Sequence, residues 1–191
     1  MAPYGTRVAR IALDIDSTLH DYWPLFRRIV HERHGLDLPY EEQREWGTTL
    51  LARDEVVACI EETHSNENIL AAEPYPGAVE TVADWRRAGH WIHITSHRHT
   101  YAADATARWL ERIGMPYDDL HCSFDKVSRC VELGIDVLVD DSPINVVKAK
   151  RAGIVAATLI HPWNEEVVLA GDAIGAPSWA ELRAKLAPVL A

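Results

Sequence analysis

The residues from Ile11 to Leu19 constrain this chain most, because they join an apolar run to two closely spaced carboxylates. Val8 to Leu13 is mostly apolar and partly β-branched, which predicts a buried strand. Asp14 and Asp16 follow it directly, and alternate side chains of an extended chain share a face, so both carboxylates point the same way. Two such close charges repel unless a cation or a shared proton relieves them. The stretch therefore predicts a metal site, an acid–base pair or, more plainly, a solvated strand end.

The composition limits the classes of partner. The 191 residues carry a formal net charge of −10 and have a pI of about 5.4. This disfavours a nucleic-acid polymer or an anionic membrane surface as a partner, although a bound cation would still admit a small anionic substrate. Three cysteines without a CxxC pair are typical of reduced thiols. No long apolar stretch precedes Asp14, so we expect a cytoplasmic protein. No zinc-binding spacing of histidines occurs, so we expect no zinc site.

The chain divides into two kinds of pattern. Strand signals disappear between 20 and 72, where helical periodicity runs through 23–34, 41–46 and 54–62. From Pro74 onward, helices alternate with strands expected at 91–94, 119–122, 135–139 and 154–159. Helices between strands imply parallel pairing with right-handed crossovers. We predict an α/β fold: a doubly wound, Rossmann-like parallel sheet from residues 1–19 and 73–191, with a small helical cap, 20–72, inserted after the first strand.

Polar residues follow four of the expected strands. In strand order they are Asp14 and Asp16, Thr95 and Ser96, Lys126, and Asp140 and Asp141. Because the carboxyl ends of parallel strands meet at one edge of a sheet, these residues are expected to form one site. Each group alone has a simpler explanation as a helix N-cap, a solvated lysine or a turn. Their joint occurrence in this order favours a shared site.

This set of residues resembles the haloacid dehalogenase superfamily of phosphotransferases. The first motif of that superfamily corresponds to Leu13-Asp14-Ile15-Asp16-Ser17-Thr18-Leu19, and the later motifs to Thr95, Lys126 and Asp140-Asp141. A closer resemblance, to the 5′(3′)-deoxyribonucleotidase branch, is carried by Asp21-Tyr22, Glu73 to Ala78, Ile94-Thr95-Ser96, Asp125-Lys126 and Pro177-Ser178-Trp179. Two departures from the branch are Ser17, where glycine is usual, and Phe124, near which a basic residue is usual.

The resemblance implies a Mg²⁺-dependent phosphomonoesterase that acts through an aspartyl phosphate. Asp14 is expected to be the nucleophile, and Asp16 the general acid and then the general base. The phosphoryl group is expected to bind Thr95, Lys126 and backbone N–H groups at a helix start at Ser96. The expected Mg²⁺ ligands are Asp14, the backbone carbonyl of Asp16, and the pair Asp140 and Asp141, of which Asp141 binds directly.

The cap is expected to select the substrate. Tyr22 and Trp46 are predicted to stack on a nucleobase, and Arg98 to contact phosphate. The alternatives are that the aromatic residues form the core of the cap itself and that Arg98 makes a surface salt bridge. The predicted partner is thus a small phosphorylated substrate, a nucleotide; formation of a homodimer stays open.

Three other functions compete with a nucleotidase. A phosphatase of sugar phosphates or other small metabolites would share every motif. A receiver-like signalling module also uses Asp, Thr or Ser, and Lys on a parallel sheet, but it carries its acidic pair on strand one and its phosphoacceptor on strand three, without an inserted cap. A non-catalytic phosphate-binding relic is disfavoured because every expected catalytic group is present.

Overall fold

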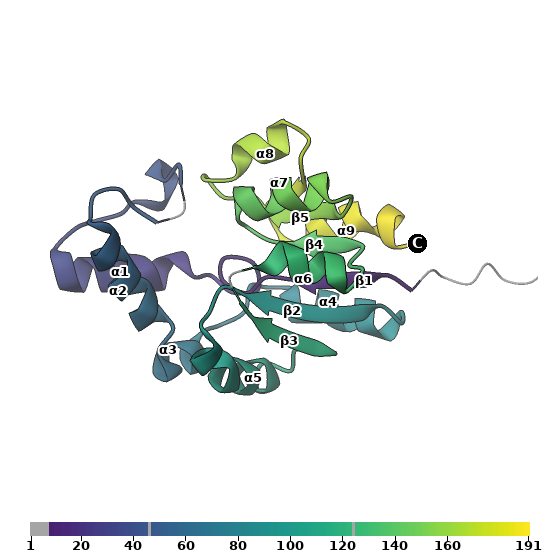
Figure 1. The fold of residues 1–191 in the computed structure, drawn as a ribbon, viewed down its shortest axis with the longest axis horizontal. Helices are drawn as coiled ribbons and strands as arrows, with labels where there is room; N and C mark the ends of the chain where they lie inside the picture. Colours follow the sequence, from purple (N-terminus) through teal and green to yellow (C-terminus); the bar gives the residue numbers. More distant parts are fainter. Residues whose placement is uncertain (1–7, 46, 124) are drawn as a thin grey trace, which may run out of the picture.

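The computed structural model describes residues 8–45, 47–123 and 125–191. Its centre is a parallel six-stranded sheet with the order β3-β2-β1-β4-β5-β6 (Figure 1). The strands are β1 (Arg10–Leu13), β2 (Trp91–Ser96), β3 (Asp119–Cys122), β4 (Val137–Val139), β5 (Val155–Leu159) and β6 (Ile174–Ala176). The chain winds in one direction from β1 to β3 and in the other from β4 to β6, so the order reverses between β1 and β4. A crevice at the carboxyl ends of these two strands is the usual ligand site of such sheets.

Helices cover both faces of the sheet. They are α4 (Ala78–Arg87), α5 (Ala103–Arg112) preceded by the short η2 (Thr100–Ala102), α6 (Lys126–Glu132), α7 (Pro143–Arg151), α8 (Glu165–Leu169) and α9 (Trp179–Leu190). Alternation along β1 sends Ile11 and Leu13 into a core with Trp109 and Leu182, while Ala12 packs in a second core with other helices. This burial on both faces explains why the strands read as continuous apolar runs. The predicted doubly wound α/β fold is confirmed.

The residues between β1 and α4 form a helical segment. It contains α1 (Trp23–His34), η1 (Tyr40–Glu42), α2 (Arg53–Thr63) and α3 (Asn66–Ala71), and α1 and α2 lie together beyond one end of the sheet (Figure 1). These two helices pack around a further buried cluster, joined by Trp163, while Ile69 of α3 belongs to the main core. Pro24 stands in the first turn of α1, and Gly35 ends that helix in the left-handed region with φ +68°. Trp23, Phe26 and Ile29 bury the inner face of α1. We refer to residues 20–72 as the insertion.

Several elements differ from the sequence-based expectation. β2 extends through Ser96, and the next helical turn begins only at Thr100, so Ser96 does not start a helix. Residues 40–42 form a 3₁₀ turn in place of a helix over 41–46, of which position 46 lies outside the described residues. The elements α3, α8 and β6 were not predicted. Each spans three to six residues, which is too short for a periodic pattern to reveal.

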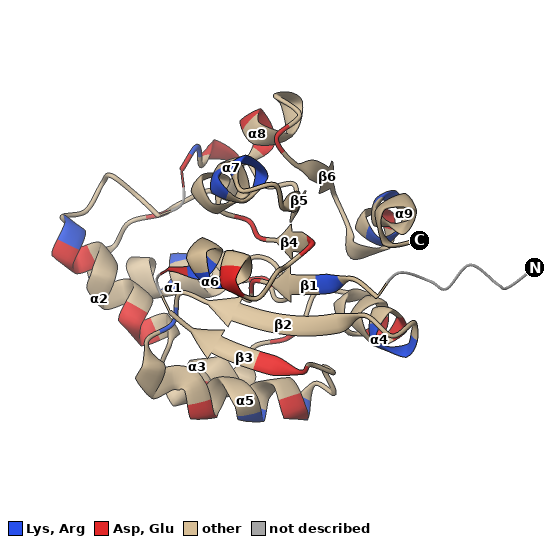
Figure 2. Ribbon diagram, turned by 45° about the vertical axis from the view of Figure 1, so that its right-hand side comes forward, with Lys and Arg blue, Asp and Glu red and all other residues tan. Residues whose placement is uncertain are grey.

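Charged residues are distributed over the helices. Figure 2 shows acidic and basic segments interspersed on α2, α4, α5 and α9, with few on the sheet itself. Interspersed charge of both signs differs from the continuous basic stripe that marks a nucleic-acid footprint. Within the described part of the chain, no helix combines the length and apolarity needed to cross a membrane.

Candidate active site

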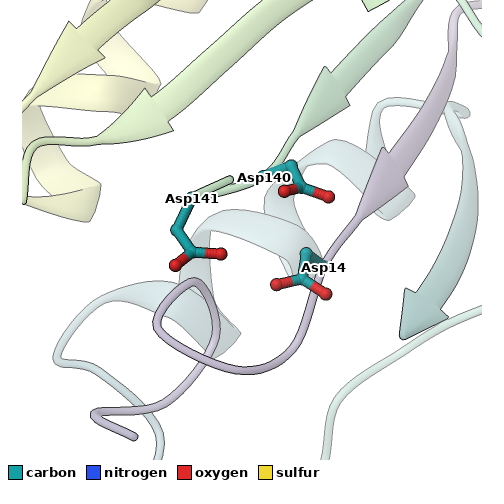
Figure 3. A group of neighbouring side chains, drawn as sticks. All are labelled: Asp14, Asp140 and Asp141. Atoms are coloured by element: carbon teal, nitrogen blue, oxygen red, sulfur yellow. The ribbon is translucent and has the colours of Figure 1, made fainter. Parts of the chain in front are cut away.

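Three carboxylates meet where the strand order reverses. Asp14 follows β1, and Asp140 and Asp141 follow β4, which is paired with β1 through Leu13 and Val139. The backbone N–H of Asp14 donates to the Val139 carbonyl at 2.9 Å, which extends the pairing to the predicted nucleophile. All three side chains are buried, and one oxygen of each lies within 4.8 Å of the others (Figure 3). The topology of the sheet thus brings together the acidic residues of two separate strand ends, as the sequence predicted.

The electrostatics of this cluster fit a bound cation. Burial, with added repulsion from Asp140 and Asp16, raises the pKa of Asp14 to about 7 although Lys126 opposes the shift. Burial and then Asp14 raise the pKa of Asp141 well above its usual range. Lys126 contacts Asp14 and lies 3.2 Å from Asp140. One buried lysine cannot balance three carboxylates, and an all-oxygen set of this kind suits Mg²⁺.

The two acids after β4 have different surroundings. Asp140 accepts hydrogen bonds from the Ser142 N–H at 2.9 Å and from the Asn145 side-chain amide at 3.1 Å, in addition to Lys126. Asp141 accepts one from Trp163 Nε1, at 3.1 Å, on Oδ2. No described residue donates a hydrogen bond to the other oxygen of Asp141. The oxygens of Asp140 are therefore engaged by the protein, while Asp141 keeps one for a ligand.

Asp16 lies apart from the three carboxylates and faces basic side chains. Its Oδ1 is 2.8 Å from His20 Nε2 and 2.7 Å from Arg98 Nη2, and its Oδ2 is 3.3 Å from His64 Nε2. Burial would raise the pKa of Asp16, but Arg98 and the two histidines hold it well below the usual range. The metal-ligand role predicted for Asp16 is that of its backbone carbonyl, and the side chain lies instead with this basic cluster.

A tight turn after β1 brings these groups together. The N–H groups of Thr18, Leu19 and His20 all donate to the Ile15 carbonyl, at 2.8 to 3.3 Å. This turn returns the chain upon itself and places the His20 ring against Asp16. Ser17 sits within it in the left-handed region, with φ +60°, a conformation that favours glycine.

Arg98 and Ser96 do not occupy the predicted positions. The Arg98 side chain is only 2% exposed and is held by Asp16 and by Thr106 Oγ1, to which Nη1 donates at 3.1 Å. The backbone N–H of Arg98 donates to the Ser96 hydroxyl at 3.2 Å. Arg98 therefore pairs with the predicted acid–base residue rather than presenting itself to a phosphate, because burial of its charge requires a carboxylate partner.

Thr95 is the next-to-last residue of β2, paired with His121 of β3, and is fully buried. Among the described residues its hydroxyl has no hydrogen-bond partner. Buried hydroxyls in proteins are nearly always hydrogen-bonded, so an unpartnered one at the carboxyl end of a central strand is suited to a phosphoryl oxygen. This arrangement is consistent with the phosphate-binding role predicted for Thr95.

A cavity of about 420 Å³ opens above these groups. Its floor contains Asp14, Asp16, Lys126 and Asp141, and α2 of the insertion supplies one wall. The remaining lining comes from the loop after β2 and the start of α7. A second cavity of about 580 Å³ lies elsewhere between the insertion and the core, and none of the clustered carboxylates lines it. We call the first of these the catalytic cavity because it contains the predicted nucleophile, and it is shared between the core and the insertion.

Tyr22 does not line the catalytic cavity. It is 1% exposed, its hydroxyl donates to Thr63 Oγ1 at 2.9 Å, and its ring stacks on Phe26. The prediction that Tyr22 contacts the substrate is therefore wrong, because its apolar ring is used to pack α1 against α2. Trp46, the other aromatic residue predicted to stack on a base, lies outside the described residues.

Four side chains of the site were not among the predicted site residues. His20 follows Asp16 by four residues, and that spacing is the only local signal of its role. His64 ends α2, and Trp163 follows β5, so both reach the site through tertiary packing alone. Asn145, in the first turn of α7, supports Asp140. The sequence did contain a signal for Asn145: Pro143 begins a helix directly after the acidic pair, which places Asn145 in the first turn beside it.

Known proteins resemble this chain along nearly its whole length. A protein of Chlorobaculum tepidum, named as a candidate 5′(3′)-deoxyribonucleotidase, is 27% identical over 184 residues, which cover 90% of this chain and 87% of that protein. A haloacid dehalogenase family hydrolase of Deinococcus radiodurans, solved with bound phosphate and sodium, has a TM-score of 0.70 at 21% identity, with 96% of each chain covered. A predicted phosphatase of Clostridium acetobutylicum has a TM-score of 0.68 at 14% identity, with 94% and 98% covered.

One family model matches almost the entire chain and not only the residues of the site. It spans residues 7–187, which include the sheet, the insertion and all four motifs. The match agrees with the haloacid dehalogenase-like fold of the structural neighbours and with a hydrolase of the phosphatase and nucleotidase type. This chain therefore belongs to the family described as 5′ nucleotidase, deoxy (pyrimidine), cytosolic type C protein (NT5C).

Proposed function

We propose that this protein is a Mg²⁺-dependent phosphomonoesterase that dephosphorylates nucleoside monophosphates through an aspartyl phosphate. The observation that carries the proposal is the buried cluster of Asp14, Asp140 and Asp141 with Lys126, at the reversal point of a parallel sheet. A cytoplasmic location is part of the proposal and agrees with the family description. Membership of the family also argues against the receiver-like alternative, as does a phosphoacceptor candidate placed on β1.

The metal would be held by the carboxylates of Asp14 and Asp141 and by the backbone carbonyl of Asp16. Asp140 would support the site, since its oxygens already accept hydrogen bonds from Asn145 and Lys126. When bound, Mg²⁺ would neutralise the negative charge of the phosphoryl group, which otherwise repels an attacking carboxylate. The pKa values of Asp14 and Asp141 are raised by burial and by repulsion from neighbouring carboxylates, and a bound cation would relieve that repulsion.

In the first half of the reaction, an Asp14 oxygen would attack phosphorus while the bond to the leaving oxygen breaks. Lys126 and the Thr95 hydroxyl would stabilise the phosphoryl oxygens as charge develops on them. Asp16, which Arg98 keeps ionised before substrate binds, would take up a proton in the substrate complex and give it to the leaving alkoxide. It would then take a proton from the water that hydrolyses the aspartyl phosphate. Arg98, His20 and His64 would orient Asp16 for both transfers.

Support for a nucleotide substrate comes from the family and from the name of the Chlorobaculum relative. A cavity of about 420 Å³ also lies within the range of small-molecule sites. One observation favours the alternative of a sugar phosphate or another small metabolite: no Phe, Tyr or Trp stands among the described lining residues, so a stacking platform for a base is not seen.

A substrate panel on the purified protein tests the proposal. We expect hydrolysis of p-nitrophenyl phosphate that is lost on exhaustive chelation and restored by Mg²⁺. We expect kcat/KM for deoxyribonucleoside and ribonucleoside monophosphates to exceed that for hexose and pentose phosphates. Full activity after chelation would contradict the metal-dependent mechanism, whereas equal or better use of sugar phosphates would contradict only the nucleotidase assignment.

A further inference from the structure

One face of α2 runs outward from the catalytic centre. Val57, Glu61 and His64 recur at helical spacing and all line the catalytic cavity, with Ile60 beside them. His64, at the end of α2, lies 3.3 Å from Asp16. Since a helix rises 1.5 Å per residue, Val57 lies about 10 Å farther along the axis than His64. This face therefore follows the path that a leaving group would take away from the scissile phosphate.

The outer part of the cavity is partly apolar. Val57 of α2 is 43% exposed, and Ile144 of α7 is 66% exposed, yet both line the cavity. Ile60 adds a third branched aliphatic side chain. Aliphatic groups exposed inside a ligand cavity gain free energy when an apolar surface covers them. A leaving group with a flat or apolar face would provide that cover.

The charge along the cavity changes from the floor to the outer wall. Lys126 is the one Lys or Arg among the described lining residues, and it is already in contact with Asp14 and Asp140. Glu61 stands on the α2 wall, one turn from His64, and Figure 2 shows acidic segments along this helix. A second phosphate on the leaving group would thus meet the carboxylate of Glu61, which is solvent-exposed, and no described Lys or Arg at this wall. The other ionisable side chains of the outer lining are His64, His97 and His99.

We propose that Glu61 is a specificity-determining residue, which admits leaving groups that are uncharged and carry a hydrogen-bond donor and rejects those that carry a second phosphate. The preferred substrates are then monophosphates of nucleoside-like alcohols, and nucleoside bisphosphates are excluded. This inference rests on the proposed function. Glu61 acts by repelling the wrong substrate as well as by accepting a hydrogen bond from the right one.

The test compares a nucleoside 5′-monophosphate with the matching 3′,5′-bisphosphate at about pH 8, where an ordinary imidazole is uncharged. The variants are Glu61→Gln, which removes the charge, and Glu61→Lys, which reverses it. Glu67→Lys is the matched control, because it makes the same charge change at an exposed position of α3 that does not line the cavity. Thermal unfolding establishes that each variant is folded.

We expect the ratio of kcat/KM for bisphosphate to that for monophosphate to rise at least tenfold in Glu61→Lys and by a smaller factor in Glu61→Gln. Glu67→Lys should leave the ratio at the wild-type value. The inference is overturned if the wild type uses both substrates equally, or if folded Glu61→Lys keeps the wild-type ratio. Hydrolysis of p-nitrophenyl phosphate by the wild type separates these results from failure of the proposed function. If the wild type does not hydrolyse this substrate, both the proposed function and this inference are contradicted.

Discussion

Arg98 and Asp16 are joined by a two-point contact across 82 residues of sequence, with Nη2 2.7 Å from Oδ1 and Nε 3.3 Å from Oδ2. Both side chains are buried, so the planar guanidinium sets the orientation of the carboxylate with little competition from water. The contact makes Arg98 a positioning residue for the proposed acid and base. Its side chain is anchored in turn by Thr106.

Arg98→Lys should lower kcat for alkyl phosphates by about tenfold, because lysine keeps the charge but cannot make the two-point contact. The loss should be smaller for p-nitrophenyl phosphate, whose leaving group needs no proton. Arg98→Met should instead lower the free energy of unfolding by about 3–5 kcal/mol, since it leaves a buried carboxylate without its main partner. Steady-state kinetics with both substrates and thermal unfolding check these outcomes. Equal losses for both substrates in folded Arg98→Lys would argue against a positioning role.

Asp14→Asn should abolish turnover and covalent labelling by substrate, since an amide cannot attack phosphorus as a carboxylate does. Asp16→Asn should still be labelled by p-nitrophenyl phosphate but should accumulate the phosphorylated enzyme, because the base for its hydrolysis is lost. Intact mass spectrometry after rapid quenching distinguishes the two variants. Labelling of Asp14→Asn would contradict the assignment of the nucleophile.

Mg²⁺ should stabilise the fold more at high pH than at low pH. In the metal-free protein the pKa of Asp14 is raised to about 7, against 3.8 in the unfolded chain. The folded state therefore binds more protons than the unfolded state between these two pH values, so stability falls as pH rises through this window. Saturating Mg²⁺ replaces those protons, so its effect on Tm should be larger at about pH 8 than at about pH 5. Asp141→Asn should raise Tm in the absence of metal and should reduce the rise in Tm that Mg²⁺ produces. If the rise in Tm with Mg²⁺ is the same at both pH values in the wild type, this cluster is not the binding site.

Ser17→Gly should stabilise the protein. Ser17 has φ +60°, which costs a non-glycine residue about 1–2 kcal/mol, and its buried hydroxyl has no hydrogen-bond partner among the described residues. Glycine offsets part of the gain through its greater freedom in the unfolded chain, so the net increase should be about 0.5–1 kcal/mol, or about 1–4 °C in Tm. Ser17→Ala removes the hydroxyl but keeps the strained backbone, so comparing the two by calorimetry separates these contributions. A lower Tm for Ser17→Gly would show that the hydroxyl is satisfied.

Tyr22→Phe should affect stability and leave substrate use at the wild-type level. The substitution removes the buried hydrogen bond to Thr63 and keeps the ring that packs on Phe26. The loss should be about 1 kcal/mol, or about 2–4 °C in Tm. KM for nucleoside monophosphates should stay within about twofold of wild type. A large increase in KM with an unchanged Tm would restore the predicted role of Tyr22 in binding the substrate.

The sequence by itself determined the class of fold and the positions of the acidic cluster. Continuous apolar runs ending in Asp14 and in Asp140-Asp141 are local patterns, and sheet topology makes the ends of parallel strands converge. The length of the helices between strands was enough to predict parallel pairing. These features depend on residues close together in the chain, which is why periodicity reveals them.

Only the tertiary structure decided what surrounds the reacting groups. Tyr22 and Val57 both belong to the insertion, yet the first is buried against Thr63 and the second lines the cavity. Arg98 was expected at the phosphate and instead holds Asp16. The physical reason is that a buried charge or hydroxyl must find its partner wherever packing brings one within hydrogen-bond reach, and that partner can stand 41 or 82 residues away. No local period in the sequence encodes such a choice.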